Sequence, residues 1–333
     1  MSVLEEKARE FSQAAELILN VKEEVQTFIV GQEEVIDQVL WSMLAGGHVL
    51  LEGLPGLGKT MLVKTISECL DLKFSRIQFT PDIMPSDITG TMLLQPDDKG
   101  KQSFIFHEGP LFANMVLADE INRATPKTQS ALLEAMGEKT VTIMGETKEM
   151  AKPFFVLATQ NPIDMEGTYP LPEAQTDRFI CKVDVTYPTK AELKEIVKRT
   201  TGTSGRSLEK VARVQDVVFL QNLAKEIIIS EDLIEYAVDL IAYTHPGASD
   251  APEIVKQYVQ YGSGPRGLQS LISLAKARAL CLGRYHVSIG DLKQTVKAVL
   301  RHRIILNFEA EANGMTADII IDRLIEEVGA LTK

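Results

Sequence analysis

Gly53-Leu54-Pro55-Gly56-Leu57-Gly58-Lys59-Thr60 decides the fold of this chain, because the segments on either side of it differ in character. Residues 48–52 are apolar and predict a strand, and residues 61–66 predict a helix. A strand, a glycine-rich loop and a helix in this order are typical of a P-loop. The glycines let backbone N–H groups turn toward a phosphate, and the positive end of the helix strengthens the attraction.

The loop also predicts which groups contact a bound nucleotide. In a P-loop the lysine, here Lys59, reaches the β- and γ-phosphates, and the hydroxyl of Thr60 coordinates Mg²⁺. The other predicted contacts are the rest of the loop and the residue after it: Gly53, Pro55, Gly56, Leu57, Gly58 and Met61. A loop that only joins a strand to a helix is the plainer interpretation, and the correct flanking elements disfavour it. We predict that the chain binds ATP and Mg²⁺.

Composition places the chain among ordinary globular proteins with room for two domains. It has 333 residues, 45% of them hydrophobic and 24% charged. The net charge of −11 argues against a protein that coats nucleic acid, because no basic surplus can replace counterions. The first residues do not resemble a signal peptide, and no apolar run reaches the length of a membrane span. Three widely spaced cysteines without a CxxC pair favour a reduced, cytoplasmic setting.

Periodicity divides the chain into an α/β part and a helical part. After an amphipathic helix over 4–28, apolar runs alternate with helical stretches, and the predicted strands are 48–52, 74–79, 114–118, 153–158 and 179–185. Continuous apolar strands separated by helices predict a mostly parallel sheet covered on both faces. From residue 187 the pattern is helical, with a possible mobile loop at 200–213. We predict domains at 1–186 and 187–333.

Polar residues end two of the predicted strands. Asp119 and Glu120 follow an apolar run about sixty residues after the P-loop, and a parallel sheet delivers such strand ends to the nucleotide crevice. Asp119 would hold Mg²⁺, and Glu120 would orient the attacking water. Asn161 ends the next strand and could position a water or contact the γ-phosphate, although Asn-Pro is also a plain turn signal.

Two arginines are candidates for a contact across a subunit boundary or within the lid. Arg178 precedes the last strand and could reach a neighbouring nucleotide as an arginine finger, or simply pair with Asp177 at the surface. Arg266 lies in Gly262-Ser263-Gly264-Pro265-Arg266-Gly267, which opens a helix of the second domain. On its own this segment is only a loop that carries a charge.

The order of these motifs resembles an AAA+ ATPase, and more closely the MoxR family. The resemblance runs from about residue 8 to the end and is densest in the first domain. It is carried by Val30-Gly31-Gln32-Glu33, 46–60, Phe79-Thr80-Pro81-Asp82, Pro85-Ser86-Asp87-Ile88-Thr89-Gly90, Gly109-Pro110-Leu111-Phe112-Ala113-Asn114, 117–124, 127–136, Ala158-Thr159-Gln160-Asn161-Pro162 and 171–175. Thr125 and Thr176 depart from the usual proline and leucine, away from the chemistry.

The resemblance implies a role for each motif. Lys59 and Thr60 would belong to Walker A, Asp119 and Glu120 to Walker B; Asn161 would be sensor 1, Arg178 the finger and Arg266 sensor 2, acting in cis or in trans. It places Val30 and Gly31 near the adenine. Residues 89–108 would be the helix-2 insert and residues 139–150 the pre-sensor hairpin, both facing the pore of a ring or only covering core edges. Arg123 would cross the subunit interface or pair with an acid.

The function implied by the resemblance is ATP hydrolysis by a homo-oligomeric ring, most simply a hexamer. The output would be chaperone-like remodelling, or metal- or cofactor-dependent maturation, of client proteins, often beside a partner with a von Willebrand A domain. A DNA-acting motor, a chelatase motor subunit and a nucleotide-dependent regulator remain as alternatives. The acidic charge disfavours the first, and the intact hydrolytic residues disfavour the last. The client and the pathway cannot be read from the sequence.

Overall fold

The computed structural model describes residues 3–96, 102–161, 168–201 and 207–331. Its centre is a five-stranded sheet in the order β2-β5-β8-β1-β9, and all neighbouring strands run parallel. The strands are β1 (Val49–Glu52), β2 (Phe74–Gln78), β5 (Met115–Asp119), β8 (Phe155–Gln160) and β9 (Cys181–Asp184). All five predicted strands are therefore confirmed, with ends that shift by one or two residues.

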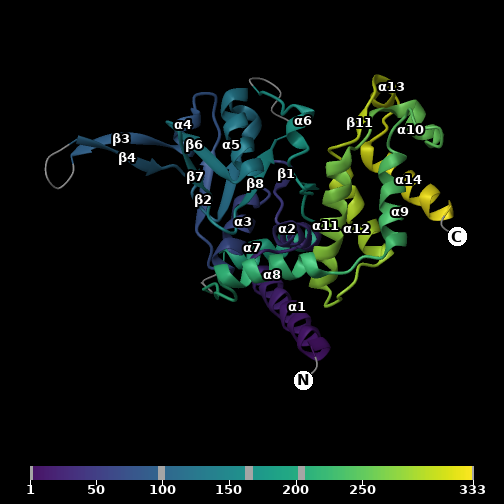
Figure 1. Cartoon of the computed structure of the whole chain (residues 1–333), viewed down its shortest axis with the longest axis horizontal. Coiled ribbons are helices and arrows are strands. Elements are labelled where there is room, and N and C mark those ends of the chain that lie inside the picture. The colour runs from purple at the N-terminus through teal and green to yellow at the C-terminus, as the bar shows by residue number, and fades with distance from the viewer. Residues whose placement is uncertain (1–2, 97–101, 162–167, 202–206, 332–333) are drawn as a thin grey trace.

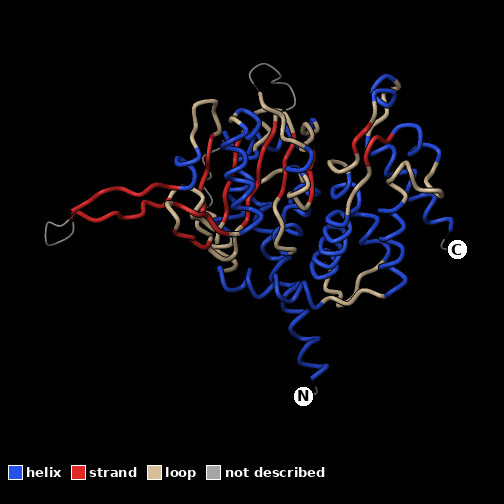
Figure 2. The backbone as a smooth tube through the Cα atoms, turned by 45° about the horizontal axis from the view of Figure 1, so that its top comes forward, coloured by secondary structure: helices blue, strands red, loops and turns tan. Residues whose placement is uncertain are grey.

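Side chains along the strands alternate between two hydrophobic clusters, because successive residues of a strand point to opposite faces. In β1, Val49 and Leu51 join the cluster of α1 (Val3–Phe28), α2 (Glu33–Leu44) and α3 (Lys59–Cys69), whereas Leu50 joins the other. That second cluster contains α4 (Pro85–Thr89) and α5 (Pro126–Glu138). The sheet is thus covered on both faces, which confirms the predicted αβα sandwich (Figure 2).

Two antiparallel hairpins leave the sheet domain where the sequence predicts them. The first pairs β3 (Gly90–Pro96) with β4 (Gln102–Glu108), and its turn lies outside the described residues. Figure 1 shows this hairpin projecting well beyond the body of the molecule. The second pairs β6 (Thr140–Ile143) with β7 (Glu146–Glu149). Both hairpins confirm the strand pairing expected from the sequence.

The C-terminal part is mainly helical, and most of it lies beside the sheet, with its first two helices below the sheet domain in the view of Figure 1. Its helices are α7 (Lys190–Thr201), α8 (Val214–Glu226), α9 (Glu231–Ala242), α10 (Glu253–Tyr258), α11 (Pro265–Cys281), α12 (Ile289–Leu300), α13 (Phe308–Ala312) and α14 (Ala317–Leu331). A two-stranded sheet of β10 (Val259–Tyr261) and β11 (Ile305–Leu306) was not predicted, because such short strands carry no periodicity. Part of the suggested mobile loop, residues 202–206, lies outside the described residues.

Side-chain caps explain where two of these helices begin. The N–H of Thr189 donates to Glu192 Oε2 at 2.6 Å, and the N–H of Glu192 donates back to Thr189 Oγ1 at 3.3 Å. At the start of α12 the N–H of Ser288 donates to Oδ2 of Asp291 at 2.8 Å, which is one half of the same arrangement. These side-chain contacts satisfy N–H groups that the first helical turn leaves unpaired. Within the described ranges, no helix combines the length and apolar character needed to cross a bilayer.

A buried histidine makes the stability of this fold depend on pH. His48 lies just before β1, where Nδ1 accepts from the N–H of Val156 at 3.0 Å and Nε2 faces the carbonyl of Met136 at 3.1 Å. Burial lowers the pKa of His48 from 6.5 to about 4, with a smaller opposing effect from the Met136 carbonyl. As the pH falls below 6.5, the unfolded chain therefore binds a proton at His48 that the folded chain does not bind until about pH 4. The contribution of His48 to the free energy of unfolding is therefore greatest above pH 6.5 and decreases toward pH 4.

We expect His48 to account for a loss of about 3 kcal/mol in unfolding free energy between pH 7 and pH 4. Urea unfolding at several pH values measures this loss. His48→Gln should be less stable at pH 7 and have a flatter pH dependence, whereas the exposed control His286→Gln should follow the wild type. An unchanged slope in His48→Gln would show that this histidine is not the source.

Candidate active site

The P-loop is open where a phosphate would bind. Helix α3 begins at Lys59, and its N-cap residue Gly58 has no side chain with which to satisfy the first N–H groups. Gly56 and Gly58 have φ of +82° and +77°, and nothing lies within 4 Å of a Cβ placed on either. Glycine is favoured at such angles, and the open space leaves the N–H groups accessible to an anion.

Lys59 is held within this loop. Its Nζ donates to the carbonyl of Gly53 at 2.6 Å, so the ammonium lies over the loop that it follows. Burial lowers the pKa of Lys59, and the nearby carboxylates of Asp119, Glu120 and Glu52 oppose that effect. An anionic phosphate would supply the charge compensation that a half-buried ammonium requires.

Asp119, at the end of β5, has contacts to both carboxylate oxygens. Oδ1 accepts from the hydroxyl of Thr159 at 2.6 Å, and Oδ2 accepts from Nη2 of Arg76 at 2.7 Å. The parallel register places Gln78 of β2 opposite Asp119, and Arg76 lies two residues earlier on the same strand. Carboxylate and hydroxyl oxygens are the ligands that Mg²⁺ takes, and Thr60 lines the same cavity as Asp119. The two residues therefore fit a magnesium ion.

Glu120 has an unusual backbone and a restrained side chain. Its φ of +58° lies in the left-handed region, which glutamate rarely adopts, and its N–H donates to Thr159 Oγ1 at 2.8 Å. Oε2 accepts from Nε2 of Gln78 at 2.8 Å and from Nη1 of Arg123 at 3.0 Å. Arg123 thus pairs with an acid of its own chain, one of the two roles considered from the sequence. Strained backbone conformations are concentrated at functional sites, so the left-handed conformation of Glu120 supports a functional role for its carboxylate.

One cavity of about 450 Å³ joins these groups. Besides the P-loop residues Pro55 to Met61 it is lined by Asp119, Glu120, Asn161, Thr159, Arg76 and Gln78. Asn161 is buried, and the amide nitrogen of Asn122 donates to its carbonyl at 3.5 Å. The structure therefore brings together the predicted phosphate, metal and water-directing residues.

Three residues of this cavity are absent from the sequence-based candidates: Arg76, Gln78 and Thr159. Arg76 and Gln78 are polar residues in a strand of the central sheet, which is the one signal that could have identified them. Their position opposite Asp119 depends on β2 pairing with β5, which the sequence does not specify.

An adjoining cavity of about 350 Å³ has an apolar lining. It shares Gly56, Leu57, Gly58 and Met61 with the first and adds Phe28, Ile29, Val30, Gln32, Tyr187, Pro188, Leu193, Ile196 and Arg199. An apolar slot that continues from a phosphate loop suits a flat base. Val30 lies in its wall, and Gly31 packs so closely against Glu192 that a Cβ would lie 2.0 Å from Oε1. The contribution of α7 through Leu193 and Ile196 was not predicted.

Arg178 and Arg266 lie away from the P-loop, near the amino ends of the parallel strands. β1 and β9 are parallel with Val49 opposite Cys181, so Arg178 precedes the amino end of β9 while Gly53 follows the carboxyl end of β1. The four residues of β1 alone separate these ends by about 13 Å. Arg178 Nη1 instead donates to the carbonyl of Leu133 at 3.0 Å. In a parallel sheet this separation follows from the sequence positions, because Arg178 precedes the strand at 179–185 whereas the P-loop follows the strand at 48–52.

The two arginines share a cavity of about 320 Å³ with the end of α5 and the segment before β1. Arg266 is 60% exposed at the start of α11, and its Nη1 lies 3.5 Å from Oδ2 of Asp177. A cation at the positive end of a helix is electrostatically unfavourable, so helix stability does not explain this residue. The P-loop and the arginine pair therefore line two separate cavities at opposite ends of the strands.

Comparison with known proteins agrees with this geometry. Residues 48–181 match the family model described as the ATPase family associated with various cellular activities (AAA), and residues 251–324 match the AAA lid domain. Chaperone MoxR1 of Mycobacterium tuberculosis is 42% identical, over 92% of this chain and 80% of that protein. Protein MoxR of Methylorubrum extorquens is 30% identical, over 89% of this chain and 90% of that protein.

A solved structure leads to the same conclusion. The crystal structure of a candidate ATPase from Cytophaga hutchinsonii superposes with a TM-score of 0.89 at 42% identity, covering 97% of this chain and 96% of the other. The relatives and this structure span both the sheet domain and the helical part. The chain belongs to the MoxR family of AAA+ ATPases.

Proposed function

We propose that the chain hydrolyses ATP at composite sites between adjacent subunits of a cytoplasmic ring, most simply a hexamer, and uses the energy to remodel partner proteins. The observation that carries the hydrolytic part is the position of the two cavities, one around the P-loop and one around the two arginines. Arg178 and Arg266 lie beyond the amino ends of the strands, and the P-loop lies beyond their carboxyl ends. A head-to-tail ring brings one face of each subunit against the other face of its neighbour.

Each P-loop face would supply most of the chemistry. Lys59 and the N–H groups at the start of α3 bind the phosphates, while Thr60 and Asp119 hold Mg²⁺, whose charge neutralises the phosphate oxygens. Glu120 accepts hydrogen bonds from the attacking water and directs it in line, and Asn161 orients that water or the γ-phosphate. Val30, Gly31 and the apolar cavity hold the base.

The opposite face would supply the arginines in trans. Arg178 becomes the finger when its guanidinium exchanges the Leu133 carbonyl for a neighbour's γ-phosphate. Arg266 lies in the same cavity and so acts on that same nucleotide as sensor 2, in trans. Both guanidiniums stabilise charge that develops on the transferred group.

The β3–β4 hairpin would contact the client. Its paired strands expose Leu93, Leu94, Phe104 and Ile105 by 40%, 53%, 61% and 43%. Apolar side chains this exposed on a projecting hairpin mark an interaction surface rather than core packing. The name of the M. tuberculosis relative, Chaperone MoxR1, supports a protein client. A von Willebrand A domain partner would deliver such a client.

Replacing both Phe104 and Ile105 by serine should leave basal ATP hydrolysis unchanged and weaken binding of a reduced, carboxymethylated protein used as an unfolded probe. The expected loss is about tenfold, the effect of removing roughly 1.4 kcal/mol of apolar contact. Fluorescence anisotropy measures binding, and phosphate release measures stimulation by the probe. Phe308→Ser is the matched control, because Phe308 is 84% exposed outside the hairpin. Stimulation by DNA, with none by unfolded protein, would favour the DNA-acting motor instead.

A further inference from the structure

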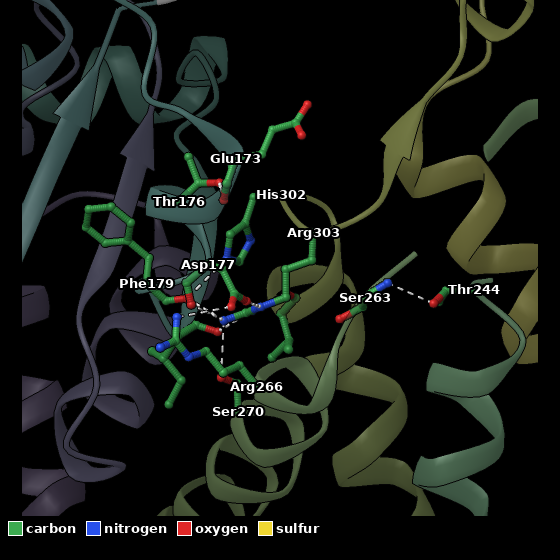
Figure 3. Close-up of polar contacts among 12 residues, drawn as sticks. Glu173, Thr176, Asp177, Phe179, Thr244, Ser263, Arg266, Ser270, His302 and Arg303 are labelled. Carbon is green, nitrogen blue, oxygen red and sulfur yellow. Dashed lines mark hydrogen bonds and ion pairs between the residues drawn. The ribbon is translucent and has the colours of Figure 1, made fainter. Parts of the chain in front are cut away.

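Arg303, which follows α12, is a buried charge with an unusual set of partners. Its side chain is 2% exposed, and Nε donates to Oδ1 of Asp177 at 2.8 Å across 126 residues of sequence. Asp177 immediately precedes Arg178. The helical part of the chain is therefore joined to the segment that carries Arg178 through a partly buried ion pair (Figure 3).

Arg303 also donates to the backbone of that same segment, besides a bond from Nη1 to the carbonyl of Val299 in α12. Nη2 donates to the carbonyls of Asp177 at 3.2 Å and Phe179 at 2.6 Å, and Nη1 donates to the carbonyl of Ile180 at 3.1 Å. Nε2 of His302 lies 3.1 Å from the carbonyl of Phe179. Backbone carbonyls of the residues before and after Arg178 are thus held by two consecutive side chains.

The same unit reaches the second arginine. The carboxylate of Asp177 is shared, with Oδ1 bound to Arg303 and Oδ2 3.5 Å from Nη1 of Arg266. Arg303 Nη2 also donates to the hydroxyl of Ser270, one turn along α11 from Arg266, at 3.2 Å. Gly267 is closely surrounded here, since a Cβ there would lie 2.0 Å from Oγ of Ser263 and 3.2 Å from Cδ of Arg303. Figure 3 shows Asp177, Arg266 and Arg303 converging between the two parts of the chain.

Stability alone is a weak explanation for such a unit. A buried arginine pays a large desolvation penalty, and apolar side chains of similar volume often replace buried ion pairs without loss of stability. Burial lowers the pKa of Arg303 against the opposing influence of Asp177, which reflects that penalty. Apolar packing does not fix the orientation of the groups it contacts. A planar guanidinium does, because it holds several hydrogen-bond acceptors at defined angles.

We propose that Arg303 and Asp177 form a positioning unit that sets Arg178 and Arg266 in one fixed arrangement for the neighbouring subunit's nucleotide. Movement of the helical part then moves both arginines together. This inference rests on the proposed function, in which the two arginines act in trans. Arg303 is a positioning residue, since it acts through Arg178 and Arg266.

Arg303→Gln should lower ATP turnover by about tenfold to a hundredfold, the loss typical of a catalytic group displaced by about 1 Å. Binding of a fluorescent ATP analogue and assembly should be unchanged, because the P-loop is intact. Arg301→Gln is the matched control, since Arg301 pairs with Asp184 at 2.5 Å and Asp318 at 2.8 Å rather than with the finger segment. It should retain turnover within about twofold.

Hydrolysis by mixtures of two variants distinguishes misplaced arginines from a general loss of activity in the Arg303→Gln subunit. Lys59→Ala has an intact arginine face, and Arg178→Ala has an intact P-loop face. Arg303→Gln mixed with Lys59→Ala should regain hydrolysis, and mixed with Arg178→Ala it should not. The reverse pattern would place the defect in its own P-loop and overturn the inference.

A second variant distinguishes a loss of positioning from a folding defect of Arg303→Gln. Asp177→Asn keeps the side-chain shape, removes the charge shared by Arg303 and Arg266, and should complement in the same pattern. If neither variant regains hydrolysis with Lys59→Ala while Arg178→Ala does, the positioning unit is wrong and the trans site stands. If Arg178→Ala also fails with Lys59→Ala, the proposed function itself is wrong.

Discussion

Glu120→Gln should bind ATP as tightly as the wild type and lose turnover by roughly 10²–10⁴-fold, the contribution of a positioned general base. Glutamine keeps the length of the side chain and can still accept from Gln78 and Arg123, so the cavity keeps its shape. It lacks the negative charge needed to polarise water. Phosphate release measures turnover, and the anisotropy of a fluorescent ATP analogue measures binding.

Glu253→Gln is the control for the loss of a carboxylate, because Glu253 is 91% exposed and remote from the cavity. It should hydrolyse ATP at the wild-type rate. If Glu120→Gln does so as well, Glu120 is not the water-directing acid. If that variant instead fails to bind nucleotide, the carboxylate is required for binding rather than for directing water.

Arg178→Ala should reduce turnover by roughly 10³–10⁵-fold, the effect of removing an arginine finger. ATP binding should persist, because Arg178 lies near the amino ends of the strands and the P-loop lies beyond their carboxyl ends. Arg178→Lys should recover little, since an ammonium cannot reproduce a bidentate contact to phosphate oxygens. Steady-state hydrolysis and sedimentation, measured on the same samples, separate lost catalysis from lost assembly.

Arg323→Ala controls for the loss of an arginine, since Arg323 is 62% exposed and pairs with Glu326 on α14. It should leave turnover unchanged. A fully active Arg178→Ala protein, or a wild type that hydrolyses ATP at full rate as a monomer, would contradict a site completed by a second subunit.

The sheet domain and the residues around the P-loop cavity could be predicted because their signals are local. The P-loop is contiguous in sequence, and Asp119, Glu120 and Asn161 each end an apolar strand. Parallel strands carry their carboxyl ends to one edge, so these residues had to meet there. No knowledge of strand order was required for that step.

The remainder depends on contacts between distant segments. Arg76 faces Asp119 only because β2 pairs with β5 in a particular register. Arg303 meets Asp177 across 126 residues, and nothing in the local sequence distinguishes it from the surface arginines. The apolar cavity beside the P-loop takes one wall from α7, in the part of the chain assigned to the lid. Such pairings are properties of the tertiary structure rather than of any window of residues.

The most direct test of the central claim is the hydrolysis rate of an equal mixture of Lys59→Ala and Arg178→Ala subunits. Each variant alone should be inactive, since one lacks the P-loop lysine and the other lacks the finger. In a randomly mixed ring about a quarter of the interfaces pair an intact P-loop with an intact arginine face, so about a quarter of wild-type hydrolysis should return. A mixture that assembles into rings and remains inactive would contradict an active site shared between subunits.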